Sequence, residues 1–355
     1  FDGLVEAVGS AVENTVDPWT PLDSLQLSAY ASALFVGLAG VLLLSGASQG
    51  SSLSGVVSSL NEIRTIAYPI IGAVGALLLT GTAAVVARRL DKPAVAVLAN
   101  CAPVLLACSI AGALPAGPWT AYGALAAGVA LTIGALSSLV LPGRLRASGL
   151  TPAIIGVSLG LFGLLSGTLG IQPERICALL AALLLLACLS IPWLAMASTP
   201  VRVTGPSAAA QIDPRHIDKS VSMGVSMSVS IRLGTCLALV ILTPILCSTS
   251  QGIALSALIG AALMLSTRSI RSRVEVLIGV LSGMAVLAWA AYAAALQSAT
   301  SLLLVLVTSL TGSLLVLATN VVTPKTRPWL SRTADTISTL VIIAVPPFAL
   351  YMWGM

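Results

Sequence analysis

The residues best suited to acid–base chemistry lie in one short stretch, DPRHID. His216 is the single histidine of the chain, and Asp213 and Asp218 flank it. A histidine beside a carboxylate can serve as a general base that the acid orients. No H-E-x-x-H or G-x-x-x-x-G-K-[ST] sequence occurs in the chain to supply a metal site or a nucleotide site. We therefore interpret DPRHID as an exposed polar loop and expect no enzymatic activity.

The six cysteines do not indicate a metal site either. No C-x-x-C pair occurs, and a chain with one histidine lacks the ligand spacing of a zinc site. All six lie in or beside apolar runs: Cys101, Cys108, Cys177, Cys188, Cys236 and Cys247. We interpret them as small, reduced packing residues and predict no metal or catalytic cofactor.

Basic residues form the strongest pattern. The chain has 17 Lys and Arg, and most fall in every second connection between apolar runs. These are Arg88, Arg89, Lys92, Arg144, Arg146, Arg202, Arg215, Lys219, Arg268, Arg271, Arg273, Lys325, Arg327 and Arg332. Positive residues in short loops stay in the cytoplasm, so these connections are predicted to be cytoplasmic. No cluster is interleaved with aromatic residues that could stack on bases, so nucleic-acid binding is not expected.

The elements that carry these loops are predicted to be transmembrane helices. Charged residues make up 8% of the chain, against about 25% in soluble domains. Apolar runs of about 20 residues can cross a bilayer. We predict an all-α integral membrane protein with about 11 transmembrane helices, a cytoplasmic N-terminus and a periplasmic C-terminus. The predicted spans are 27–46, 63–87, 93–113, 119–141, 150–170, 173–196, 226–247, 252–267, 274–296, 300–322 and 336–354.

Two parts of the chain are expected outside the membrane. Residues 1–23 have apolar positions at helical spacing and no Lys or Arg, which predicts an amphipathic cytoplasmic linker helix. Residues 24–355 form the transmembrane domain, and its longest connection, a polar cytoplasmic loop, is predicted at about 197–225. Because the chain starts at Phe1 and not at Met, we expect it to lack an N-terminal piece.

Five glycines lie on one predicted helical face: Gly156, Gly160, Gly163, Gly167 and Gly170. Their spacing of three and four residues leaves a bare stripe that lets another backbone approach closely. The stripe is a candidate packing surface, either within this chain or against a second copy, another subunit or lipid.

Arg232 is the charged residue that lies just inside a predicted span. No Asp, Glu, Lys or His is predicted mid-span, although coupled carriers usually keep such residues there. We expect Arg232 to reach the cytoplasmic surface, where it is a candidate contact for lipid headgroups or a partner. A buried ion pair is the alternative for this residue. Two basic clusters are candidates for the same contacts: Arg268, Arg271 and Arg273, and Lys325, Arg327 and Arg332.

The chain resembles EccD, the multi-spanning membrane subunit of mycobacterial type VII (ESX) secretion systems. The resemblance covers essentially the whole chain. It rests on the order and spacing of five segments: FDGLVEAVGSAVENTVDPWTP, VVARRLDKP, LGIQPER, LMLSTRSIRSR and RPWLSRTADTISTLVIIAVPP.

This resemblance implies a non-catalytic, channel-forming scaffold in the inner membrane. It implies a homodimer around a lipid-filled space, hence bound phospholipid, assembled with EccB, the FtsK-like ATPase EccC and EccE to export small helical proteins. It also implies a ubiquitin-like domain before residue 1, so we expect this sequence to be the membrane part of a longer protein. Two other functions remain open: a secondary transporter of small solutes and a membrane enzyme acting on lipid-linked sugars. The missing intramembrane carboxylates and the missing internal repeat argue against the transporter.

Overall fold

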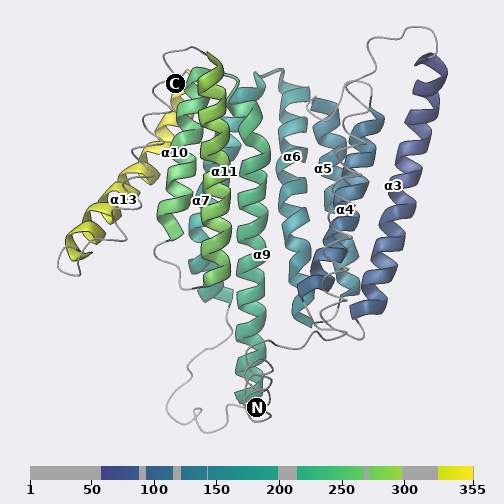
Figure 1. Cartoon of the computed structure of the whole chain (residues 1–355), viewed down its shortest axis with the longest axis horizontal. Helices are drawn as coiled ribbons and strands as arrows, with labels where there is room; N and C mark the ends of the chain where they lie inside the picture. Colours follow the sequence, from purple (N-terminus) through teal and green to yellow (C-terminus); the bar gives the residue numbers. More distant parts are fainter. Residues whose placement is uncertain are drawn as a thin grey trace, which may run out of the picture.

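The structure is a computed structural model of a membrane-type helical bundle. It describes residues 57–87, 93–114, 121–141, 143–198, 214–267, 272–297 and 327–354. The predicted linker 1–23 and the predicted spans 27–46 and 300–322 lie outside these residues. The helices stand side by side from α3 at one edge to α13 at the other (Figure 1). Their bounds are α3 Val57–Ala87, α4 Pro93–Ala113, α5 Ala121–Ala135, α6 Leu150–Leu169, α7 Pro173–Ser198, α9 Pro214–Leu246, α10 Ser250–Ser266, α11 Arg273–Gln297 and α13 Arg327–Tyr351.

The described helices are long and apolar, as the sequence predicts. Seven of them in the described part of the chain have the length and composition to cross a membrane, and α10 and the end of α13 are shorter apolar helices. Large apolar side chains such as Leu77, Leu281 and Leu340 are exposed. In water such surfaces would be unfavourable, whereas lipid accepts them. The predicted all-α membrane class is confirmed, and the count of eleven helices and the orientation stay predictions.

Helix ends follow the local chemistry of the sequence. Pro93 and Pro173 occupy the first positions of α4 and α7, where the missing N–H costs nothing. The side chain of Thr249 accepts a 3.1 Å hydrogen bond from the N–H of Gly252 and so caps α10. Gly170 ends α6 with a φ of 60°, a conformation that favours glycine.

Two predicted boundaries differ from the structure. The predicted span 119–141 is α-helical only to Ala135 and continues as the 3₁₀ helix η1, Leu136–Val140, where the Ser138 hydroxyl donates to the Ala135 carbonyl at 2.7 Å. The second half of the predicted loop 197–225 is helical, because α9 already begins at Pro214 and extends past the neighbouring helices (Figure 1). The Pro346–Pro347 pair does not break α13, which continues to Tyr351.

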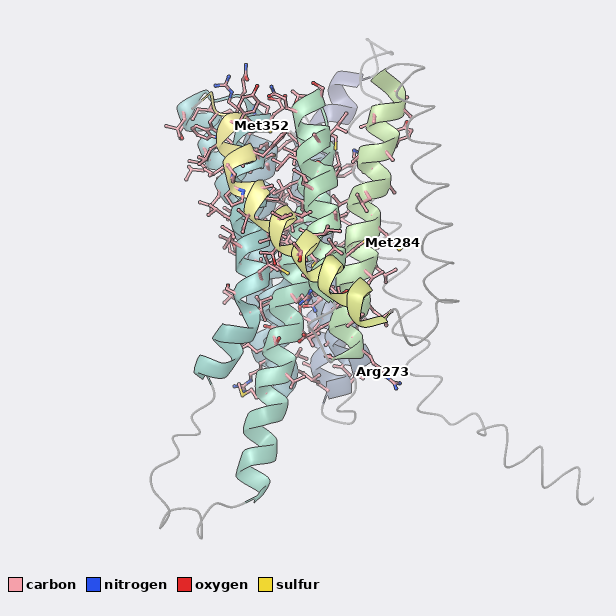
Figure 2. The ribbon with its side chains drawn as sticks, turned by 90° about the vertical axis from the view of Figure 1, so that its left-hand side faces the viewer. Arg273, Met284 and Met352 are labelled. Carbon is pink, nitrogen blue, oxygen red and sulfur yellow. The ribbon has the colours of Figure 1, made fainter. Side chains whose placement is uncertain are left out.

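The main core lies where α7, α9, α10 and α13 meet. Its largest buried side chains include Leu185, Leu239, Leu255 and Leu263, with Phe162 joining from α6. Helix α13 crosses this part of the bundle obliquely, and from Met352 it runs toward the end of the bundle at which Arg273 lies (Figure 2). A second, alanine-rich core joins α4, α5, α6 and α9. Small side chains here let the helices approach closely, as membrane bundles require.

Candidate functional site: the glycine face, the charged ends and a buried arginine

The glycine face of α6 packs against α5 within this chain. A Cβ at Gly156 would lie 2.8 Å from the Thr132 backbone nitrogen, and a Cβ at Gly163 would lie 2.8 Å from Leu125 Cα. A Cβ at Gly128 of α5 would in turn lie 2.6 Å from Gly160 Cα. These distances are too short for real side chains, so the two backbones touch only because the residues are glycines.

Three of the five predicted stripe residues behave differently. A Cβ at Gly160 would meet no heavy atom within 4 Å. A Cβ at Gly167 would only reach ordinary contact with Ala121, at 3.5 Å. Gly170 does not lie on the helical face at all, because α6 ends at Leu169 and Gly170 is its left-handed cap. The stripe is therefore shorter than the sequence pattern predicts. Any contact of this face with a second copy, another subunit or lipid stays a prediction.

A second close glycine contact, between α10 and α11, was missed from the sequence. A Cβ at Gly260 would lie 3.1 Å from the Gly283 carbonyl oxygen, and a Cβ at Gly283 would lie 2.9 Å from the Gly260 carbonyl oxygen. The spacing of Gly279 and Gly283, four residues apart on α11, is the signal that could have found it.

Arg232 lies inside the bundle, which differs from the prediction. Its side chain is 2% exposed and does not reach a headgroup or a partner in this arrangement. Its Nη2 donates to Ser266 Oγ of α10 at 3.3 Å. A Cβ at Gly279 of α11 would lie 3.2 Å from this Nη2 atom. The guanidinium is buried because the residues facing it, Ser266 and Gly279, are small. These residues lie on other helices, so the hydropathy of a single span does not predict the burial.

The predicted basic clusters are only partly described. Arg268, Arg271 and Lys325 lie outside the described residues, and Arg327 and Arg332 are placed only as backbone in the first turns of α13. Arg273 is exposed at the first position of α11, at the end of the bundle below Met284 (Figure 2). Its role as a contact for lipid or a partner stays a prediction.

The opposite end of the bundle carries a small polar cluster. Ser248 Oγ, in the turn between α9 and α10, donates to Glu174 Oε1 of α7 at 3.1 Å. Trp353 Nε1 donates to the backbone carbonyl of Arg175, the residue after Glu174, at 2.8 Å. These bonds connect three helix ends, and nothing in them resembles a catalytic arrangement.

The six cysteines are free thiols, and five are buried. The described residues contain no group of three metal-ligating side chains.

A hollow of about 260 Å³ lies between α4, α5, α6 and α9 and has apolar walls. Its lining includes Val104, Ala107, Cys108, Ala127, Leu131, Ile155, Leu159 and Ile241.

Comparison with known proteins agrees with this architecture. No curated protein matches the chain. Among solved structures, protomer 1 of the ESX-3 core complex is similar, with a TM-score of 0.63, 15% identity and coverage of 99% of this chain and 78% of that chain. A chain of the MycP5-free ESX-5 inner membrane complex in State II is similar too, with a TM-score of 0.59, 21% identity and coverage of 89% and 75%. The EccD-like transmembrane domain matches residues 25–355. Since this match takes in nearly the whole chain, the chain belongs to the EccD family.

Proposed function

We propose that this chain is a non-catalytic scaffold and channel-forming subunit of a type VII (ESX) secretion complex in the inner membrane. The family membership supports this proposal, because the resemblance above implies such a subunit. The observation that carries it in the structure is the distribution of charge. In the described spans, Arg146, Glu174, Arg175, Arg273 and Glu275 lie near span ends, and Arg232 is the charged residue farther inside. A proton- or ion-coupled carrier usually has a series of titratable residues inside the membrane, and the described spans do not show one.

The finer points of the proposal concern partners. We propose that two copies associate and assemble with EccB, the ATPase EccC and EccE, and that the complex exports small helical proteins. The apolar hollow between α4, α5, α6 and α9 supports bound phospholipid, because an acyl chain suits walls without polar groups.

The test is affinity purification of the full-length protein from its own host in mild detergent, followed by mass spectrometry and sizing. A large complex with two copies of this chain and an FtsK-like ATPase is expected. A lone chain or simple dimer without those subunits would contradict the scaffold and make solute uptake in liposomes the next measurement.

A further inference from the structure

The guanidinium of Arg232 is a buried charge whose hydrogen bonds are incomplete. Its Nη2 reaches the Ser266 hydroxyl at 3.3 Å, and its buried Nε has no hydrogen-bond partner. That hydroxyl already donates to the Leu263 carbonyl at 2.8 Å, so it is a shared and neutral acceptor. A buried ionised group is strongly unfavourable unless an opposite charge faces it. We therefore expect a carboxylate near the Arg232 guanidinium to balance its charge.

Glu275 is the described acid on the same helix–helix seam. Ser228 and Arg232 lie one turn apart on α9, and Glu275 and Gly279 lie one turn apart on α11. Ser228 Oγ donates to Glu275 Oε1 at 2.7 Å, while Gly279 lies against Arg232. The helices thus meet at two contacts one helical turn apart, which we call rungs. The first rung joins Ser228 to Glu275, and the second places Arg232 against Gly279.

We propose that Glu275 is the counter-ion of Arg232, and that the chain exchanges between the arrangement seen here and an ion-paired one. In the present arrangement Ser228 holds the carboxylate and Ser266 holds the guanidinium. In the other, Glu275 leaves Ser228 and accepts hydrogen bonds from Arg232, including one from Nε. Side chains on a helix lean toward its N-terminus, which here directs Arg232 toward the rung of Glu275. A helical turn rises about 5.4 Å, a distance that an arginine side chain can span.

The exchange concerns one part of α9. Its rungs with α11 lie just above the extension that begins at Pro214 and projects past the bundle (Figure 1). The two helices stay joined at this end in both arrangements, through Ser228 and Glu275 in the one seen here and through Arg232 and Glu275 in the other. The inference goes beyond the proposed function, and its failure would leave that function standing.

Charge exchange in the full-length protein, expressed in its own membranes, tests the pairing. Arg232→Glu and Glu275→Arg are each expected to lower the amount of folded chain at least about fivefold. The double variant is expected to return to within about twofold of the parent, because the pair is restored with its signs reversed. A double variant no better than the worse single one would overturn the proposal.

Glu174→Arg is the matched control. Glu174 is also a first-turn glutamate that accepts from a serine, but it lies at the opposite end of the bundle. It is expected not to rescue Arg232→Glu, and equal rescue by both would overturn a specific pair.

Ser228→Ala tests the exchange itself. This substitution removes the hydroxyl that competes for the Glu275 carboxylate. In the Ser228→Ala protein, the coupling energy between Arg232→Gln and Glu275→Gln, measured by thermal unfolding, should therefore grow severalfold. Coupling that is unchanged by Ser228→Ala would overturn the exchange.

Discussion

Trp353 Nε1 donates a 2.8 Å hydrogen bond to the backbone carbonyl of Arg175, which lies 178 residues earlier in the chain. The bond fastens the turn after α13 to the first turn of α7. Next to it, Glu174 accepts a hydrogen bond from Ser248, so the turn between α9 and α10 is held at the same place. In the adjoining core, the buried Val345 of α13 packs with residues of α7 and α10. The last helix is therefore anchored at its end as well as along its face.

We expect Trp353→Phe to lower the free energy of unfolding by about 1 kcal/mol, because it removes this hydrogen bond and keeps most of the ring. The measurement is the thermal unfolding midpoint of the purified protein in detergent. Trp289→Phe serves as the control, since Trp289 is an exposed ring on α11. Equal midpoints for the two variants would show that the bond does not stabilise the end of α13.

The contact between α5 and α6 predicts opposite effects at two neighbouring glycines. A Cβ at Gly163 would lie 2.8 Å from Leu125 Cα, so Gly163→Ala must push the backbones apart. We expect a loss of about 1–3 kcal/mol in unfolding free energy, typical of overpacking. A Cβ at Gly160 would meet no heavy atom within 4 Å, so Gly160→Ala should be neutral or stabilising by about 0.5–1 kcal/mol.

Thermal unfolding of the two alanine variants side by side checks this prediction. Gly163→Leu extends it, since a leucine at this position should lower the yield of folded protein and of the assembled complex. Wild-type yield and complex size in Gly163→Leu would remove the glycine face from any account of assembly.

The membrane helices were predictable because their two signals are local. An apolar run of membrane length and a proline at the first position place α4 at Pro93–Ala113, the range predicted from the sequence. The polar first part of α9 was missed for the same reason. The segment from Pro214 to Val225 is polar and carries Arg215, Asp218 and Lys219, so an apolar window stops before it although the helix continues.

The candidate site was harder to predict because it depends on which residues face each other. Arg232 was expected at the surface, and its burial follows from Ser266 and Gly279 on two other helices. The Ser228–Glu275 hydrogen bond likewise joins residues 47 positions apart. One sequence gives no signal for such pairs, whereas the glycine spacing of α6 did predict a close helix contact without naming the partner helix.

The predicted orientation of the bundle can be measured with two single cysteines. Arg273 is exposed at the end of α11 that carries the basic connections, and Ser248 is exposed at the other end of the bundle. We expect a membrane-impermeant maleimide to label Ser248→Cys in spheroplasts and to label Arg273→Cys only after permeabilisation. The parent protein is the control, because five of its six cysteines are buried. The reverse labelling pattern would contradict the cytoplasmic assignment of the basic loops.

The apolar hollow between α4, α5, α6 and α9 predicts how lipid content should respond to filling it. Ala127 of α5 lines the hollow, and Ala127→Leu would place three more carbons inside it. We expect fewer phospholipid molecules per chain after purification in mild detergent, measured by extraction and mass spectrometry. Val129→Leu is the matched control, because Val129 lies on the same helix with its side chain exposed. If both variants retain the same phospholipid content as the parent, the hollow does not hold an acyl chain, and bound lipid must contact the outer surfaces of the helices instead.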